Sequence, residues 1–155
     1  MSGYYYIDTS SLKWRYMTGS PDRIMNDSTN VVLTAELTLL EWSSALAAAY
    51  RNGDVDNPDT FKRNEFALMN DVLAERIKVL PPTVRAVEKA RYLIEYIGVE
   101  KRLSLKTGDA LHLVHAIEAA SHLAEPVTMI TSDSKLANIL QSVNLNLGLM
   151  YLPRN

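Results

Sequence analysis

Short apolar runs alternate with longer segments of helical period along this chain of 155 residues. We predict strands from the apolar runs at Tyr4–Ile7, Val31–Leu33, Ile77–Leu80, Val127–Ile130 and Leu147–Leu152. We predict helices from the periodic segments at Leu12–Met17, Thr38–Tyr50, Pro58–Leu73, Val84–Ile97, Gly108–Ala120 and Lys135–Leu140. Gly19–Asp22 should break the first helix, and the polar residues 52–60 should form a loop. This alternation predicts an α/β fold with a mostly parallel sheet.

Residues with helix-capping chemistry set the expected helix boundaries. Thr38 is expected to cap a helix, with Glu41 three residues later in the capping-box position. Thr107 is expected to cap another helix in the same way. Gly98 is expected to end the helix that precedes it.

The composition narrows the class of protein without naming a function. The chain is 47% hydrophobic and 22% charged, which is ordinary for a globular protein and enough for one domain. It has no cysteine, so disulfides and thiolate metal sites are excluded. A formal net charge of −2 disfavours nucleic-acid binding through a broad basic face. It leaves room for an acidic pocket whose charge is masked by metal ions.

No stretch of the sequence looks like a membrane anchor or a secretion signal. The apolar runs fall short of the roughly 20 residues that a membrane-spanning helix needs. The first residues, 1–4, lack the basic region and the long apolar stretch of a signal peptide. We therefore expect a mature cytoplasmic protein without a membrane partner.

Four acidic residues occupy matching places in the predicted elements. Asp8 and Asp133 each follow a strand, while Glu41 and Asp109 are expected in the first turns of helices. In a parallel sheet these positions all lie at the carboxyl edge, where ligands bind. Taken singly, each acid is more simply a helix cap or a complement to a helix dipole. Together they form an oxygen-rich set that suits Mg²⁺ or Mn²⁺.

The segments around these acids resemble the four acidic motifs of PIN domains, most closely those of VapC-type toxins. The resemblance is carried, in order, by Tyr6–Leu12, Leu37–Glu41, Thr107–Leu113 and Ile130–Leu136. An Asp-Thr-Ser after a strand, a Gly-Asp-Ala-Leu-His-Leu helix start and a Thr-Ser-Asp after a strand are together fairly specific. The match nearly spans the chain. The chain departs from the toxin pattern in two ways. Val114 and His115 stand where such toxins usually have small residues, and residues 52–65 contain an insertion.

This resemblance implies both a fold and an activity. It implies a single PIN-like, flavodoxin-like domain over residues 1–155, with the sheet order 3-2-1-4-5. It also implies Mg²⁺- or Mn²⁺-dependent cleavage of single-stranded RNA by a homodimeric toxin that an antitoxin protein inhibits. Asp8, Glu41, Asp109 and Asp133 would take the catalytic, metal-binding positions. Ser10 and Thr131 would take the hydroxyl positions beside them.

Other residues have simpler explanations. A zinc site at His112, His115 and His122 is disfavoured because no cysteine or obvious acidic ligand completes a tetrahedral set. Glu36 competes with Glu41 for the second acidic position. Glu41 fits the motif better, and Glu36 is expected to face solvent.

Basic and aromatic residues near the motifs could contact a nucleic acid. The candidates for binding phosphates are Lys101, Arg102 and Lys106, which could equally form a solvated basic loop. The candidates for stacking on bases are Tyr4, Tyr5, Trp14 and Tyr16, which are more often core or interface residues.

Two other classes of function remain compatible with the sequence. One is a PIN-like nucleic-acid-binding module without significant cleavage, and the other is a phosphohydrolase acting on small phosphate esters. If the acids form one repulsive cluster, Asp8→Asn and Asp109→Asn should keep the fold and slightly stabilise the metal-free protein. Leu40, Ala47 and Leu93 are candidates for a dimer surface, although burial in the core would explain them equally well.

Overall fold

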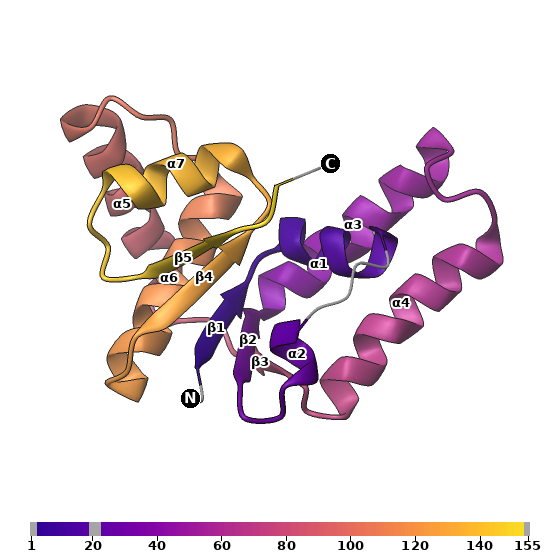
Figure 1. Ribbon diagram of the computed structural model, residues 1–155. Coiled ribbons are helices and arrows are strands. Elements are labelled where there is room, and N and C mark those ends of the chain that lie inside the picture. The colour runs from indigo at the N-terminus through magenta and orange to yellow at the C-terminus, as the bar shows by residue number, and fades with distance from the viewer. Residues whose placement is uncertain (1–2, 19–22, 154–155) are drawn as a thin grey trace.

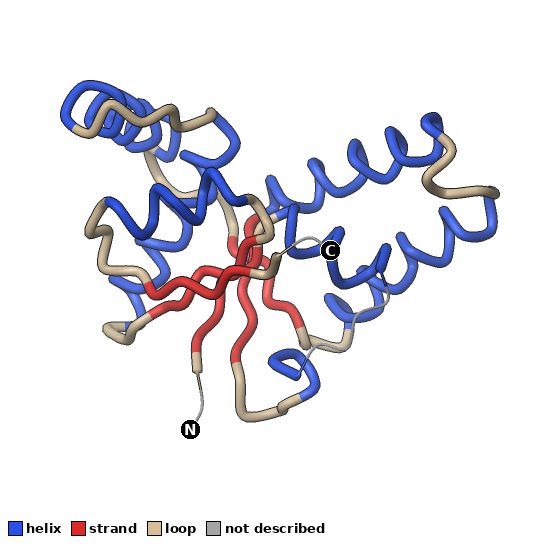
Figure 2. Tube along the Cα trace, turned by 45° about the horizontal axis from the view of Figure 1, so that its top comes forward, coloured by secondary structure: helices blue, strands red, loops and turns tan. Residues whose placement is uncertain are grey.

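Five parallel strands form one sheet in the order β3-β2-β1-β4-β5. The computed structural model describes residues 3–18 and 23–153. Its strands are β1 (Tyr4–Ile7), β2 (Val31–Ala35), β3 (Ile77–Leu80), β4 (Val127–Thr131) and β5 (Gly148–Tyr151). The central strand β1 pairs with β2 on one side and with β4 on the other, and Figures 1 and 2 show the strands side by side. The predicted fold class and strand order are confirmed.

Helices cover both faces of the sheet. Those on one face are α1 (Thr9–Thr18), α2 (Arg23–Asn26), α3 (Glu36–Asn52) and α4 (Pro58–Leu73). Those on the other are α5 (Ala86–Glu100), α6 (Thr107–Leu123) and α7 (Ser134–Ser142). The two groups stand on opposite sides of the strands in Figure 1. No helix within the described residues is both long and apolar enough to span a membrane.

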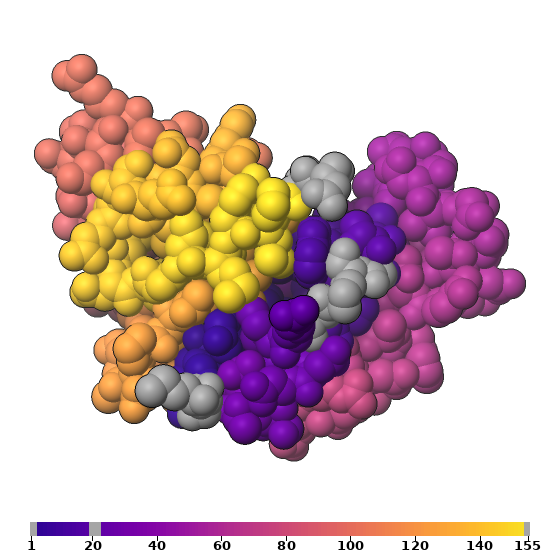
Figure 3. Space-filling model, viewed as in Figure 1, coloured from indigo at the N-terminus to yellow at the C-terminus, as the bar shows by residue number. Residues whose placement is uncertain are grey.

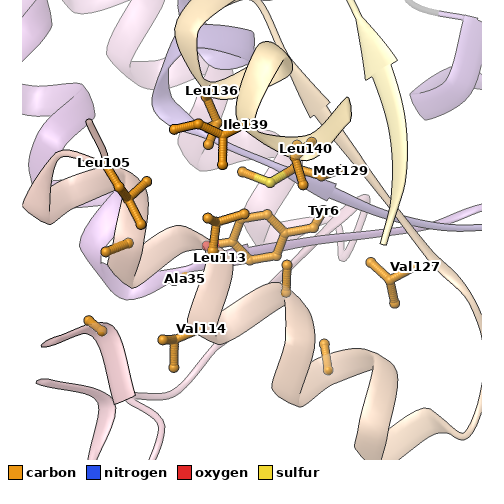
Figure 4. Packing of buried hydrophobic residues seen from close by; sticks show 14 of the residues in the cluster. Tyr6, Ala35, Leu105, Leu113, Val114, Val127, Met129, Leu136, Ile139 and Leu140 are labelled. Atoms are coloured by element: carbon orange, nitrogen blue, oxygen red, sulfur yellow. The ribbon is translucent and has the colours of Figure 1, made fainter. Parts of the chain in front are cut away.

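Alternating side chains of each strand supply the two halves of the core. In β1, Tyr6 packs under α5, α6 and α7, whereas Ile7 packs under α1 and α3. In β4, Met129 likewise packs on the face covered by α5, α6 and α7, and Ile130 on the opposite face. Because successive strand residues point to opposite faces, strands covered on both sides read as continuous apolar runs. Figure 4 shows Tyr6 packed among side chains from α6 and α7, including Leu113.

The α3–α4 hairpin extends away from the sheet and is tied back to α1. Figures 1 and 3 show it as the magenta and pink arm on the right. Asp71 of α4 is buried and accepts hydrogen bonds from the Tyr16 hydroxyl (2.6 Å), Arg76 (2.8 Å) and Arg15 (3.2 Å). A buried carboxylate with three donors is well compensated, so it fixes the base of the arm.

The prediction that Thr38 caps α3 is wrong. Strand β2 runs directly into the helix, which begins at Glu36 with Ala35 as its N-cap and without a side-chain capping bond. Thr38 lies inside the first turn and is fully buried, so its hydroxyl faces the interior. Glu41 is therefore the sixth residue of α3, in the second turn, and is not half of a capping box. Glu36 is exposed, as expected.

Other helix boundaries also differ from the predictions. Helix α5 continues through the exposed Gly98 to Glu100, since a single glycine costs only about 1 kcal/mol in a helix and the buried Ile97 anchors this turn. Helix α6 already includes Thr107, with Lys106 as its N-cap. The predicted loop 52–60 is shorter, because Asn57 caps α4 through the Thr60 amide. The break predicted at Gly19–Asp22 lies outside the described residues.

Candidate active site

The four predicted acids lie around the carboxyl edge of the central strands. Asp8 follows β1 and Asp133 lies two residues after β4, and these two strands pair in parallel, with Ile7 opposite Ile130. Asp109 is the third residue of α6, so it lies at the helix N-terminus as predicted. Glu41 approaches from α3, which follows β2, the other neighbour of β1.

Asp8 is nearly inaccessible, with 3% of its surface exposed, and hydroxyl groups surround its carboxylate. Its Oδ1 accepts hydrogen bonds from the Ser10 hydroxyl (2.7 Å), the Ser11 amide (2.8 Å) and the Ser11 hydroxyl (2.9 Å). Its Oδ2 accepts one from the Thr131 hydroxyl at 2.6 Å. The bond to the Ser11 amide is an N-terminal cap of α1, so the simpler interpretation of Asp8 as a cap is also correct.

Hydroxyl groups also join the first turn of α1 to the end of β4 and the residues that follow it. Ser10 Oγ accepts a hydrogen bond from the Ser132 amide at 2.9 Å, and the Ser132 hydroxyl donates to the Ser10 carbonyl at 3.0 Å. Thr131 Oγ1 accepts from the Asp133 amide at 3.0 Å. Ser10 and Thr131, predicted to lie beside the acids, are therefore in direct contact with Asp8. Ser132 fixes how the first turn of α1 lies against the residues that follow β4.

Asp133 is held by the start of α7. Its Oδ1 accepts hydrogen bonds from the amides of Lys135 (2.8 Å) and Leu136 (3.2 Å), as a helix N-cap does. The capping interpretation therefore holds for Asp133 as well. A cap uses the lone pairs of one oxygen and leaves the charge of the carboxylate in place, so it is compatible with a place in an acidic site.

Asp109 carries the clearest electrostatic signal of the group. The pKa of its carboxyl is raised from 3.8 to about 6, chiefly by burial and also by the charges of Asp133 and, more weakly, Asp8, while His112 and Lys106 act to lower it. These couplings place Asp8, Asp109 and Asp133 within electrostatic reach of one another. The expectation that at least one of the acids has a raised pKa is met.

Glu41 is linked to the other acids through the start of α6. Its Oε2 accepts hydrogen bonds from the Thr9 hydroxyl and from His112 Nε2, the latter at 2.8 Å. The bond from His112 lowers the pKa of Glu41, and the bond from Thr9 lowers it further, against the effect of partial burial. Its Oε1 lies beside Gly108, because a Cβ atom at that position would be 2.7 Å away. Glu41 therefore borders the helix turn that carries Asp109.

The donor set suits a hard divalent cation, although the side chains do not form a closed cage. Within residues 3–18 and 23–153, no group of three or more His, Asp or Glu side chains stands ready to hold a metal ion. The four acids are nevertheless grouped at one edge, offer only oxygen, and include one carboxyl with a raised pKa. Carboxylate oxygens are the ligands that Mg²⁺ and Mn²⁺ prefer, so the residues present fit such an ion.

Several residues that contact the acids, directly or through one other residue, were not assigned a role from the sequence. They are Tyr6, Thr9, Ser11, His112 and Ser132. The contacts of the serines and Thr9 could have been predicted from the sequence, because hydroxyl residues next to an aspartate at a strand end commonly form hydrogen bonds there. His112 lies one helical turn after Gly108, but nothing in the sequence shows that Glu41 reaches that turn.

The other two histidines are engaged elsewhere. His115 Nδ1 bonds to the Leu111 carbonyl at 2.8 Å, and its Nε2 accepts from the Thr83 amide at 3.3 Å. His122 is exposed and bonds to the Glu118 carbonyl at 2.8 Å. This pattern agrees with the sequence-based argument against a zinc site.

Among the basic candidates, Lys106 is the one whose charge reaches an acid, since it lowers the pKa of Asp109. Lys101 lies over the ring of Tyr96 at 5.9 Å, and Arg102 is exposed with a positive φ of 54°. Among the aromatic candidates, Tyr4 and Tyr5 pack against the two core clusters of the sheet. Tyr16 bonds to Asp71 and packs edge-on against Trp42.

A groove of about 460 Å³ leads from the acidic edge along α1 and α3. It begins at Ser10 and Ser132, which border Asp8, and Trp14 and Lys13 form part of its wall. Its other lining residues are Met17, Thr18, Ala45, Ala48, Ala49, Asn52 and Asp54. Trp14 is thus the one aromatic candidate that lines this groove.

A parallel five-stranded sheet of this order, with carboxylates gathered at its carboxyl edge, defines an α/β protein with a ligand site at the point where the strand order reverses. The sequence model of the PIN domain matches residues 5–139, and the chain belongs to the PIN-domain family. PIN domains are in general nucleases that use divalent metal ions. The family therefore supports a hydrolase that cleaves nucleic acid.

Two crystal structures share the fold at low sequence identity. PAE2754 from Pyrobaculum aerophilum is 18% identical with a TM-score of 0.60, over 95% of this chain and 83% of that chain. The second is VapBC2 from Rickettsia felis, solved in complex with a DNA fragment from the promoter of its own genes. It is 16% identical to this chain with a TM-score of 0.61, and the match covers 97% of this chain and 98% of that chain. No curated protein sequence matches the chain significantly. The likeness to VapC-type toxins is thus supported at the level of the fold.

Proposed function

We propose that this protein is a Mg²⁺- or Mn²⁺-dependent endoribonuclease that cleaves single-stranded RNA and acts as the toxin of a type II toxin–antitoxin pair. The observation that carries the proposal is the raised pKa of Asp109 beside Asp8 and Asp133. Carboxylates that only cap helices need not lie close enough to disturb one another's ionisation. A group whose pKa is raised by burial and by neighbouring acids is typical of a functional site.

In this proposal Asp8, Glu41, Asp109 and Asp133 hold the ions. A divalent cation bound there supplies an activated water and stabilises the charge that develops on the phosphate. The protein's own contribution is to hold the carboxylates in place. The hydroxyls of Ser10, Ser11 and Thr131 fix Asp8 with three hydrogen bonds, and the Ser11 amide adds a fourth. No serine or histidine nucleophile is required.

The groove beside the acids supports a polymeric substrate over a small phosphate ester. It extends from Ser10 past Trp14 and Lys13, which is more room than a single phosphate group fills. Unpaired bases stack on aromatic side chains, and lysines contact phosphates, so Trp14 and Lys13 suit a single strand. The preference for RNA rests on the resemblance to VapC-type toxins.

The toxin assignment implies an antitoxin, a homodimer and a cytoplasmic location. An antitoxin that places an Arg or Lys among the carboxylates would displace the metal ion and block the site. The candidate dimer residues do not form one face, because α3 and α5 lie on opposite faces of the sheet. Leu40 is 70% exposed and remains a candidate, whereas Ala47 and Leu93 are half-buried.

The activity is tested with end-labelled single-stranded RNA, incubated with the purified protein and Mg²⁺ or Mn²⁺. We expect the wild-type protein to cleave the RNA internally and EDTA to stop the cleavage. The Asp109→Asn variant should not cleave the RNA. Matched reactions with single-stranded DNA and with p-nitrophenyl phosphate separate a ribonuclease from a general nuclease and from a phosphohydrolase. RNA that is bound but left intact at every metal concentration would instead identify a binding module.

The toxin role and the dimer are tested separately. Expression of the wild-type protein should arrest growth of a bacterial host, whereas Asp109→Asn should not. Saturation with the cognate antitoxin should inhibit RNA cleavage, and undiminished activity would refute the blocked site. Sedimentation at micromolar concentration should show a dimer, and a strictly monomeric profile would refute it.

A further inference from the structure

The two oxygens of the Glu41 carboxylate have different surroundings. Oε2 accepts hydrogen bonds from Thr9 and from His112. Oε1 has no donor in the part of the chain that the structure describes, and it lies beside Gly108. A Cβ at position 108 would approach Oε1 to 2.7 Å, so the absence of a side chain there gives this oxygen its room.

His112 is held from behind by the central strand. Its Nδ1 lies 3.0 Å from the hydroxyl of Tyr6, and the two rings pack edge-on with centroids 6.0 Å apart. Both residues are almost completely buried, whereas Glu41 is about one-third exposed. A chain of hydrogen bonds therefore runs from the core of β1, through α6, to a carboxylate at the edge of the site.

The direction of the hydrogen bonds along this chain follows from its two ends. A carboxylate can only accept, and Oε2 of Glu41 lies 2.8 Å from His112 Nε2. The Tyr6 hydroxyl lies 3.0 Å from His112 Nδ1 and has a proton to donate. His112 Nε2 therefore donates to Glu41, while Nδ1 accepts from Tyr6. The partner on one ring nitrogen selects the tautomer that the other presents.

We propose that His112, oriented by Tyr6, is a positioning residue that occupies Oε2 of Glu41 and leaves Oε1 facing the site as the oxygen that binds the divalent cation. The inference rests on the proposed metal-dependent function and adds the residues that hold one of its ligands. Groups that orient a ligand in this way typically change metal affinity or activity by roughly 10–100-fold when they are removed.

His115 provides a comparison on the same helix. It is as deeply buried as His112, but its ring nitrogens contact the Leu111 carbonyl and the Thr83 amide. Replacing either histidine with leucine removes a buried imidazole from α6. The His112 substitution alone removes a donor from Glu41, so the difference between the two variants isolates that contact.

The experiment measures Mn²⁺ binding to the full chain without RNA, from the loss of the free-ion signal in electron paramagnetic resonance. We expect His112→Leu to weaken Mn²⁺ binding by roughly tenfold or more, and His115→Leu to leave it within roughly twofold of wild type. His112→Gln carries an amide that can still donate to Oε2, so it should bind Mn²⁺ within roughly threefold of wild type. Unfolding curves confirm that each variant is folded.

A double-mutant cycle separates positioning from a general loss of structure. In a Glu41→Gln background, His112→Leu should weaken Mn²⁺ binding by less than roughly twofold, because the carboxylate that His112 positions has already been removed. Gly108→Ala tests the same carboxylate without disturbing the core. Its Cβ must displace Oε1, so it should also weaken Mn²⁺ binding, and it keeps the test decisive should His112→Leu not fold.

The outcomes distinguish the two proposals. Wild-type affinity in both His112→Leu and Gly108→Ala overturns the positioning role while leaving the proposed function intact. Equal losses from His112→Leu in the wild-type and Glu41→Gln backgrounds overturn it as well, since the effect then does not pass through Glu41. A wild-type protein that neither binds Mn²⁺ nor cleaves RNA overturns the proposed function and this inference with it.

Discussion

Asp8 and Asp109 lie at the same edge of the sheet, but the protein surrounds their carboxylates in opposite ways. Asp8 is almost fully buried and accepts four hydrogen bonds from the first turn of α1 and the end of β4. Asp109 is half-buried, and no group within residues 3–18 and 23–153 donates a hydrogen bond to its carboxylate. The fold stabilises the charge of Asp8 and leaves that of Asp109 poorly compensated.

This difference assigns separate tasks to the two residues. A carboxylate fixed by several donors provides a ligand of defined position, and hydrogen bonds to charged groups are worth roughly 1.5–3 kcal/mol each. A carboxylate without donors, beside other acids, gains most from a cation. In the proposed site, Asp8 is therefore the ligand that the fold preorganises, and Asp109 is the one whose charge most favours metal binding.

The largest expected effect is on cleavage, where the two residues should behave alike. Asp8→Asn and Asp109→Asn each replace a charged ligand with a neutral amide. Each should lower the rate of RNA cleavage by more than the roughly 10–100-fold typical of groups that only support a ligand. Single-turnover cleavage with saturating Mg²⁺ measures this. A wild-type rate in either variant would show that the residue is no metal ligand.

The stability of the metal-free protein should separate the two residues by sign. Asp109→Asn removes a poorly compensated charge and should stabilise the fold by roughly 1–2 kcal/mol at neutral pH, after allowing for its partial exposure. Asp8→Asn gives up an acceptor for the Thr131 hydroxyl and should destabilise it by roughly 1–3 kcal/mol. Urea unfolding in EDTA measures both values. Shifts of the same sign would contradict the comparison.

The expectation from the sequence that both substitutions stabilise the protein is therefore revised for Asp8. The sequence predicted that the acids share an edge, because strand ends and helix starts in a parallel sheet meet there. It did not predict how each acid is compensated, because that depends on contacts such as Thr131 to Asp8, which join residues 123 positions apart.

The same limit applies to Glu41 and its partners. The motif identified Glu41, but its place in the helix was predicted wrongly, because Thr38 has the chemistry of a cap and is used as a core residue instead. His112 reaches Glu41 across 71 positions and Tyr6 across 106, and nothing local indicates either contact. Element order follows from local patterns, whereas contacts between elements depend on packing.

The pH dependence of stability should also distinguish Asp109. Below its unfolded pKa of 3.8, the carboxyl is protonated in both states and costs nothing. As the pH rises from 3.8 to about 6, the unfolded chain releases this proton while the folded protein keeps it, so stability falls. Relative to Asp109→Asn, the wild type should lose roughly 1–2 kcal/mol across this window and then level off.

Thermal or urea unfolding of the two proteins at several pH values in EDTA measures this loss. Repeating the series with Mn²⁺ should reverse it, since a bound cation favours the ionised carboxyl. Parallel stability curves for the wild type and Asp109→Asn in EDTA would show that the pKa of Asp109 is not raised in the metal-free protein.

An effect on stability alone is expected from the hydroxyl that bonds to Asp8. Thr131→Val keeps the shape of a fully buried side chain but removes its hydroxyl, leaving Asp8 Oδ2 and the Asp133 amide each short of one partner. The loss should destabilise the protein by roughly 1–3 kcal/mol, and less in an Asp8→Asn background, where the bond to Asp8 is already weakened. Unfolding free energies of the four proteins in this cycle give the coupling, and strictly additive losses would refute it.

The smallest effect should come from Lys106, the exposed cation beside Asp109. Its charge lowers the pKa of Asp109, so Lys106→Met should raise that pKa further and destabilise the metal-free protein at neutral pH by a few tenths of a kcal/mol, as is usual for exposed charges. The effect should vanish in an Asp109→Asn background and at high salt, because both remove the interaction. Asp8 should not respond, since its compensation comes from buried hydroxyls. A loss from Lys106→Met that persists after Asp109 has been replaced would show that this lysine acts through another group.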